Sequence, residues 1–122
     1  MRERLAALGL VAAGLTLSAC GPTVMNSQII GTLNDPPARL EIRLVQPDIL
    51  DTWTTHELWG VNAGSEPVCA GRRDAGMSWD AFLIPPRSEL RLQGLGNDPG
   101  PGQTALVPLN GRTCSVGLLI GP

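Results

Sequence analysis

Lysine and tyrosine are absent from this chain of 122 residues, which has only one histidine, one phenylalanine and three cysteines. The absence of lysine excludes Schiff-base chemistry, the lysine of phosphate-binding loops and Ser/Lys dyads. A metal centre needs three or four converging ligands, and this chain offers few histidine or thiol ligands. We therefore expect no cofactor, no metal site and no enzymatic activity.

No apolar run is long enough to cross a membrane as a helix. The longest, residues 5–17 (LAALGLVAAGLTL), has thirteen residues, whereas a span needs about 20. Arg2 and Arg4 precede this run and small residues end it, which is the pattern of a cleaved signal peptide. We predict a signal peptide over residues 1–19.

The signal region ends in Leu17-Ser18-Ala19-Cys20-Gly21, which closely resembles the lipobox of bacterial lipoproteins. The resemblance implies cleavage before Cys20, lipid on its thiol and on the new amine, and a body that faces the periplasm. Two or three acyl chains hold a protein stably on a membrane. Gly21, where an aspartate would favour the inner membrane, implies delivery to the outer membrane. The alternative is an ordinary secretory signal with a chance cysteine.

Removal of 19 residues would leave 103, enough for one compact domain. The mature body would carry seven arginines and ten acidic residues, a net charge near minus three. This charge argues against a nucleic-acid partner.

Two cysteines remain once Cys20 is lipidated. In an oxidising compartment Cys69 and Cys114 are expected to form a disulfide. The closed loop of about 46 residues corresponds to roughly 4 kcal/mol of loop-closure stabilisation. The alternative is a pair of buried free thiols or a redox pair, but the chain has no Cys-x-x-Cys spacing to support a redox role.

Residues 20–38 are predicted to be the lipidated cysteine and a flexible tether. Three prolines, few large apolar residues and no helical periodicity indicate a coil. Such a segment would reach about 60 Å when fully extended and would hold the domain away from the bilayer. Residues 28–33 are the part of this segment that could still form a short strand.

Residues 39–122 are predicted to form an all-β domain, because glycine and proline interrupt the sequence every 8 to 12 residues. Residues 39–45 (RLEIRLV) alternate, placing Leu40, Ile42 and Leu44 on one face and Glu41 and Arg43 on the other. The expected strands lie within residues 39–45, 52–62, 66–71, 79–84, 89–95, 104–109 and 112–120.

The last two expected strands form the clearest hairpin. Asn110-Gly111 supplies the two positive φ angles of a type I′ turn, and in residues 112–120 the alternation places Cys114 on the core face. We predict a small immunoglobulin-like two-sheet β-sandwich with one disulfide, with a small β-barrel as the alternative. Residues 61–68 (VNAGSEPV) and 84–92 (IPPRSELRL) resemble bacterial immunoglobulin-like and fibronectin-like domains over less than half of the mature chain.

Loops on a rigid sandwich often carry recognition. The glycine- and proline-rich segment 94–102 has no lysine for a phosphate, so we interpret it as a mobile recognition loop. The candidate partner-binding residues are Trp53, Arg72, Arg73, Asn97 and Asp98.

The leading hypothesis is a lipid-anchored, non-enzymatic periplasmic protein that binds a protein partner as an accessory or scaffold subunit of an envelope complex. The first alternative is a small-ligand or metal carrier at the membrane. The second is an enzyme acting on envelope polymers through His56, with Asp51 or Glu57 as its orienting group. For that enzyme, residues 76–80 (GMSWD) come nearest to a nucleophile elbow but lack the closing glycine.

Overall fold

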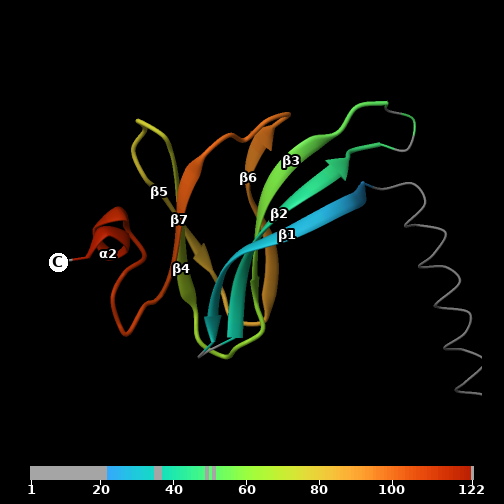
Figure 1. Cartoon of the computed structure of the whole chain (residues 1–122). Coiled ribbons are helices and arrows are strands. Elements are labelled where there is room, and N and C mark those ends of the chain that lie inside the picture. Colours follow the sequence, from blue (N-terminus) through green and yellow to red (C-terminus); the bar gives the residue numbers. More distant parts are fainter. Residues whose placement is uncertain (1–21, 35–36, 49, 51, 122) are drawn as a thin grey trace, which may run out of the picture.

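The computed structural model describes residues 22–34, 37–48, 50 and 52–121. Within these residues the chain forms seven strands and one short helix (Figure 1). The signal peptide and lipobox predicted from the sequence lie outside the described residues. The elements are β1 (Thr23–Asn34), β2 (Pro37–Gln46), β3 (Thr55–Asn62), β4 (Val68–Asp74), β5 (Asp80–Ile84), β6 (Ser88–Gly96), β7 (Gly102–Pro108) and α2 (Val116–Ile120).

The strands form two antiparallel sheets. Sheet A has the order β1-β2-β3-β6 and sheet B has the order β5-β4-β7. The prediction of a two-sheet β-sandwich is confirmed, and the alternative of a closed barrel is wrong. If β2 is counted as the first strand, β2-β3-β6 and β4-β7 match the A-B-E and C-F pairings of immunoglobulin-type sandwiches. After β7 the described chain continues into α2 instead of adding a further strand to sheet B.

The core lies between the two sheets and is small. Its fully buried members come from both layers: Leu40 of β2 faces Val68 and Ala70 of β4 and Ile84 of β5. Leu40 belongs to the apolar face predicted for residues 39–45, but Ile42 and Leu44 of that face are only partly buried and Glu41 of the opposite face is buried. The partly buried residues that pack against this cluster are Ile30, Leu33, Ala38, Phe82, Leu92 and Leu106.

Gly60 allows the two sheets to approach each other at the centre of β3. A Cβ atom at this position would lie 2.4 Å from Cδ1 of Ile84 and 3.2 Å from Cδ1 of Leu92. Real Cβ contacts are not this short, so any larger residue would push β5 and β6 away from β3. The glycine therefore permits the tight packing that a small core needs.

The turn between β3 and β4 is organised by the buried amide of Asn62. Its Nδ2 donates to the carbonyl oxygens of Glu66 (2.8 Å) and Ile84 (3.2 Å), and its Oδ1 accepts from the backbone N–H of Gly64 (2.9 Å). This connection falls between the strands expected within residues 52–62 and 66–71. The Asn62 side chain thus links the β3–β4 connection, which leads from sheet A to sheet B, to the end of β5.

The predicted tether is mostly a strand, which is a correction. Residues 23–34 form β1, a twelve-residue edge strand that pairs with β2 from Thr23↔Gln46 to Asn34↔Pro37. Register shifts at Val24/Asn26 and Ile29/Gly31 interrupt the two-residue alternation, and this interruption explains why the sequence pattern indicated a coil. The ordered domain begins at least fifteen residues earlier than expected, since β1 starts at residue 23 and the domain was predicted from residue 39.

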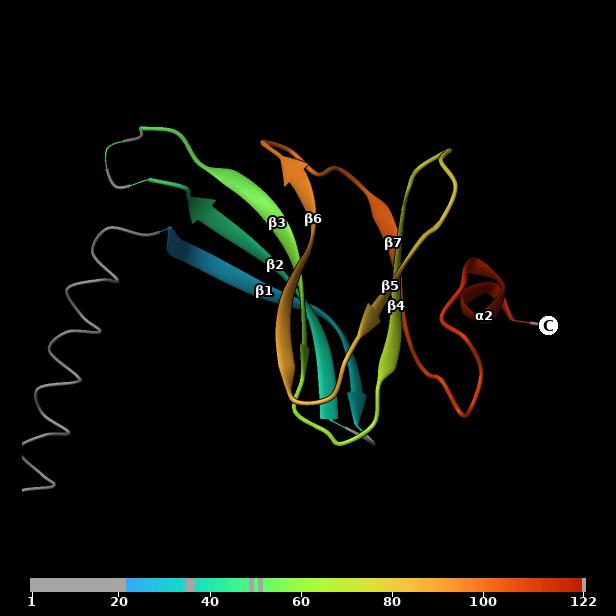
Figure 2. The same ribbon diagram turned by 180° about the vertical axis from the view of Figure 1, so that it is seen from behind.

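The last predicted strand, residues 112–120, is also corrected. Asn110 and Gly111 have the expected positive φ angles of 50° and 80°, but residues 112–121, as far as the structure describes the chain, form no strand paired with β7. Residues 116–120 instead form α2, and Leu119 packs so close to β4 that a Cβ at Gly71 would lie 2.3 Å from its Cδ1. Figures 1 and 2 show α2 on the outer side of sheet B. A short apolar run fits a helix as well as a strand.

The predicted disulfide joins Cys69 of β4 to Cys114, with 5.3 Å between the two Cα atoms. Cys69 is fully buried and shares the outer face of β4 with Gly71. The bond therefore fixes the segment that leads into α2 against sheet B. Among the residues described, no helix is long and apolar enough to cross a membrane.

Candidate functional site

The candidate partner-binding residues all lie at one end of the sandwich, called here the loop end. Its described residues are 47–48, 50 and 52–54 between β2 and β3, 75–79 between β4 and β5, and 97–101 between β6 and β7, together with the adjoining strand ends. The strand register places these connections together, because His56 pairs with Gly96 and Asp74 pairs with Gly102. Both views show them at the same end of the molecule (Figures 1 and 2).

Arg72 lies inside the loop end rather than on its surface. It is only 4% exposed, because it continues the inward-facing row of Val68 and Ala70 along β4. Its Nη2 donates to Oδ1 of Asp74 (2.9 Å) and to the carbonyl oxygen of Pro99 (3.3 Å). Arg72 therefore joins the β6–β7 loop to β4, and it supports a binding surface instead of contacting a partner.

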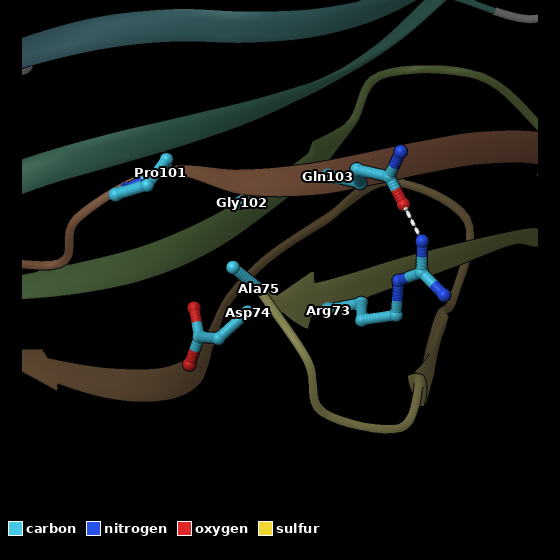
Figure 3. Close-up of a pocket in the computed structure, with 6 residues that line it drawn as sticks. All are labelled: Arg73, Asp74, Ala75, Pro101, Gly102 and Gln103. Atoms are coloured by element: carbon cyan, nitrogen blue, oxygen red, sulfur yellow. Dashed lines mark hydrogen bonds between the residues drawn. The ribbon is translucent and has the colours of Figure 1, made fainter.

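Arg73 points to the opposite, outer face of β4 and forms the centre of an exposed group. Its guanidinium lies 5.4 Å from the ring centroid of Trp79 and donates to the side-chain oxygen of Gln103 on β7. Met77, at the tip of the β4–β5 hairpin, is 66% exposed. Figure 3 shows Arg73 and Gln103 beside a hollow of about 290 Å³ lined by Arg73, Asp74, Ala75, Pro101, Gly102 and Gln103.

Asn97 and Asp98 are exposed in the β6–β7 loop, whose last residue, Pro101, lines this hollow. Asp98 uses its Oδ1 to accept a hydrogen bond from the backbone N–H of Gly100 (3.3 Å), which forms an Asx turn. Both φ at Gly96 (78°) and φ at Gly100 (64°) lie in the left-handed region. The loop thus has a defined conformation with two polar side chains facing solvent.

Trp53 lies in the β2–β3 loop at the far side of the loop end from the β4–β5 hairpin (Figure 1). It is 54% exposed, and Leu50 in the same loop is 86% exposed. Asp48 accepts a hydrogen bond from the backbone N–H of Leu50 (3.1 Å), which directs this turn. The loop therefore presents two large apolar side chains to solvent at the tip of sheet A.

A polar hollow of about 200 Å³ lies behind the exposed group. Its lining includes Arg72 and Gln93, and the Nε of Arg72 and the Oε1 of Gln93 are buried without a hydrogen-bond partner among the described residues. Such atoms cost free energy unless water or a ligand pairs with them. The lining residues are Arg72, Asp74, Met77, Ser78, Asp80 and Gln93.

The outer face of sheet A carries a network of ion pairs that sequence reasoning did not find. Glu41 accepts from the Nε atoms of Arg39 and of Arg43 (2.8 Å for Arg43), and Arg43 also donates to Glu89 (2.6 Å). The guanidinium of Arg43 stacks 4.3 Å from the ring centroid of Trp59. The alternation of residues 39–43 indicated that these charges share a face, but the partners on β3 and β6 depend on register.

The network changes the protonation equilibria of its buried members. Burial by itself would raise the pKa of Glu41, but the hydrogen bonds and positive charges of Arg39 and Arg43 outweigh burial and hold this pKa below its ordinary value. Burial likewise opposes the charged form of Arg43, yet Glu41 and Glu89 raise the pKa of Arg43 above its ordinary value. Each group therefore favours the charged form of its partner.

A third hollow, of about 380 Å³, adjoins this network close to the start of β1. Its apolar lining comes from β1, β2 and β3, and the indole Nε1 of Trp59 donates to Oε1 of Glu57 (3.0 Å), whose other oxygen accepts from Arg91 (2.7 Å). The lining residues are Pro22, Val24, Arg43, Val45, Pro47, Glu57, Trp59 and Arg91.

Among the described residues, the His56 side chain contacts the backbone of β6 and not Glu57, one of the two orienting groups named for the enzyme alternative. Its Nδ1 lies 3.0 Å from the carbonyl oxygen of Gly96. Glu57, the next residue on β3, points to the other face and binds Trp59 and Arg91. Asp51 lies outside the described residues, as does the lipidation candidate Cys20.

The described part of the chain brings together no group of three or more His, Cys, Asp or Glu residues suited to a metal ion.

No protein-family model, curated protein or solved structure matches this chain. Its function must therefore be inferred from its own residues.

Proposed function

We propose that this protein is a lipid-anchored lipoprotein of the bacterial periplasm that binds a protein partner as an accessory or scaffold subunit of an envelope complex. Lipid on Cys20 is the proposed anchor, and Gly21 after it favours the outer membrane. The lipobox Leu17-Ser18-Ala19-Cys20 supports the anchor. The disulfide between Cys69 and Cys114 suits an oxidising compartment.

The observation that carries the binding role is the exposed group around Arg73 at the loop end. Methionine, arginine and tryptophan are enriched where proteins bind one another. Here Arg73, near the end of β4, lies over the ring of Trp79, and Met77 belongs to the same β4–β5 connection as Trp79. We call this group the partner surface and define it by Arg73, Met77, Trp79, Asn97, Asp98 and Gln103.

Hydrogen bonds from the buried Arg72 fix the segments that carry the partner surface. Arg72 donates to both Asp74 and Pro99, so the two loops that carry the surface share one buried clamp. A surface that is ordered before binding loses less conformational entropy when it binds. This arrangement favours recognition of a folded partner.

Site-specific photocrosslinking in living cells tests this role. A photoreactive amino acid is placed at Met77 or Asn97, and the matched control is Arg112, which is exposed at the opposite end of the sandwich. We expect a discrete protein adduct from positions 77 and 97 and none from position 112. The same adduct from all three positions, or from none, would contradict the proposed surface.

The anchor is tested in the same cells with Cys20→Ser. The variant should lose lipid, leave the membrane fraction and give less adduct from position 77, because the partner is expected at the membrane. Normal membrane partition and normal processing of Cys20→Ser would contradict the lipid anchor.

A second candidate function, a carrier of a small polar ligand, is favoured by the polar hollow. A ligand with one hydrogen-bond acceptor and one donor would pair with Nε of Arg72 and Oε1 of Gln93. Native mass spectrometry of the protein released gently from membranes would then detect a mass above that of polypeptide and lipid. An unoccupied protein in that spectrum would count against the carrier.

A further inference from the structure

The start of β1 lies only a few residues from the proposed anchor. Cys20 and Thr23 are three residues apart, and a fully extended chain of that length spans about 11 Å. The polar headgroup layer of one leaflet is itself roughly 5 to 8 Å thick. If the acyl chains of Cys20 enter the hydrocarbon core, β1 must therefore begin at the membrane surface.

The end of sheet A nearest to that point is apolar and exposed. Val24 and Met25 are each about half exposed, and Leu50 and Trp53 are exposed in the β2–β3 loop, which follows the end of β2 that pairs with the start of β1. In this register Val24 pairs with Val45, from which β2 runs directly into the loop. We call this group of four residues the anchor edge: Val24, Met25, Leu50 and Trp53.

Both the position of the anchor edge and its apolar side chains favour contact with lipid. We propose that the anchor edge inserts into the headgroup region of the leaflet that holds Cys20, so that the sandwich lies on the bilayer in a fixed orientation. This inference rests on the proposed lipid anchor. It assigns Trp53, a candidate for partner binding from the sequence, to lipid instead.

A lipid surface fits these side chains better than a second protein does. Tryptophan favours the interface, because its ring is amphipathic, and leucine, methionine and valine gain by leaving water at the same depth. Asp48, the charged residue that shares the β2–β3 loop among those described, disfavours an anionic surface. The expected surface is therefore zwitterionic phospholipid.

The orientation that follows places the other elements away from the bilayer. Figures 1 and 2 show α2 at the side of the molecule opposite to the start of β1. The β4–β5 hairpin, which carries much of the partner surface, belongs to sheet B and is separated from the β2–β3 loop by the β6–β7 loop. A single protein can thus contact the membrane and a partner at the same time.

Tryptophan fluorescence of the mature lipoprotein in vesicles tests the orientation. The vesicles contain phosphatidylethanolamine and phosphatidylcholine, with bromine on the acyl chains either close to the headgroup or close to the terminal methyl. We expect quenching that is stronger for bromine near the headgroup. Trp53→Phe should lose most of this quenching, and Trp79→Phe should keep it.

A pair of leucine and isoleucine variants provides a matched control for folding and for insertion. Leu50→Ser removes an apolar side chain from the anchor edge, whereas Ile120→Ser removes one exposed on α2. Reduced quenching in Leu50→Ser and unchanged quenching in Ile120→Ser support the inference. Equal quenching in both variants, or equal loss in Trp53→Phe and Trp79→Phe, would overturn it.

Failure of the anchor and failure of the orientation give different results. The intact mass of each sample reports whether Cys20 carries lipid, and flotation reports whether the protein is on the vesicles. A protein without lipid that does not float contradicts both the anchor and this inference. A lipidated protein that floats without quenching contradicts the inference alone.

Discussion

Sheet A and sheet B protect their outer faces in different ways. On sheet A, arginine and glutamate side chains from β2, β3 and β6 cover the face, with Arg43 stacked on Trp59. On sheet B, a disulfide and the apolar side of α2 cover the face above Gly71. The stability of the ion pairs on sheet A depends on pH and salt, and that of the disulfide on sheet B depends on redox conditions.

The comparison also separates the proposed tasks of the two sheets. The tip of sheet A carries the anchor edge, whereas sheet B carries the hairpin of the partner surface. Sheet B is also the smaller of the two, and its outer cover is partly covalent. We infer that the covalent cover compensates for the small size of the sheet that carries most of the proposed partner surface.

The largest expected effect comes from removing the disulfide. The double substitution Cys69→Ser and Cys114→Ser should lower the free energy of unfolding by about 4 kcal/mol, because the unfolded chain regains the entropy of a long open loop. Chemical denaturation of the variant and of the oxidised wild type measures this difference. Similar midpoints for the two proteins would show that sheet B does not depend on its covalent cover.

A smaller effect is expected from the buried carboxylate on sheet A. Glu41→Gln should cost about 2 kcal/mol, because two charge-assisted hydrogen bonds to arginine are weakened. The matched control is Glu89→Gln, which removes a half-exposed partner from the same Arg43 and should cost at most about 0.5 kcal/mol. Equal costs in urea denaturation would contradict the burial argument.

Acidification should weaken the same interaction to a lesser degree. The pKa of Glu41 in the folded protein lies below its ordinary value of 4.5. A carboxyl with a lowered folded pKa contributes full stability above its unfolded pKa and loses it as pH falls through the folded pKa. The difference in stability between wild type and Glu41→Gln should therefore shrink below about pH 4.5. A constant difference in thermal melts from about pH 7 to about pH 3 would contradict this assignment.

The smallest expected effect concerns the fit of α2 on sheet B. Gly71→Ala places a methyl group against Leu119, and because the tip of a leucine side chain can shift, the cost should be about 1 kcal/mol. Gly117→Ala is the matched control, since its Cβ would meet only Ser115 Oγ at 3.8 Å. Alanine is also the better helix former, so this control should be neutral or slightly stabilising in the same melts.

The sequence predicts the two-sheet fold from local patterns and the disulfide from the cysteine count. Glycine and proline at regular intervals divide the chain into short strands, and β3 ends at Asn62 close to such a break. The disulfide joins distant residues, but it follows from counting, because only Cys69 and Cys114 remain once Cys20 is assigned to the lipid.

The errors arise where tertiary context decides. Register shifts in β1 break its alternation, so the strand was mistaken for a tether. The apolar run of α2 fits a strand or a helix, and the close approach of Leu119 to Gly71 is a tertiary contact. Arginine side chains are usually exposed, so the sequence predicted Arg72 at the surface. Its place in the alternation of β4 turns the side chain inward, where it is buried.

The candidate site was predicted only in part. Sequence placed Arg73, Asn97 and Asp98 in loops or at a strand end, and strand register brings them to one end of the sandwich. Met77 and Gln103 were missed, because a hairpin tip and a cross-strand neighbour are defined by pairing. The ion pairs on sheet A were missed for the same reason.

The intact mass of the mature protein purified from membranes tests the central claim most directly. The account predicts a polypeptide that begins at Cys20 and carries the added mass of a diacylglycerol, with a further acyl chain where the amine is modified. The same measurement on Cys20→Ser should show no lipid. An unmodified polypeptide, or one that retains residues 1–19, would contradict the lipid-anchored function.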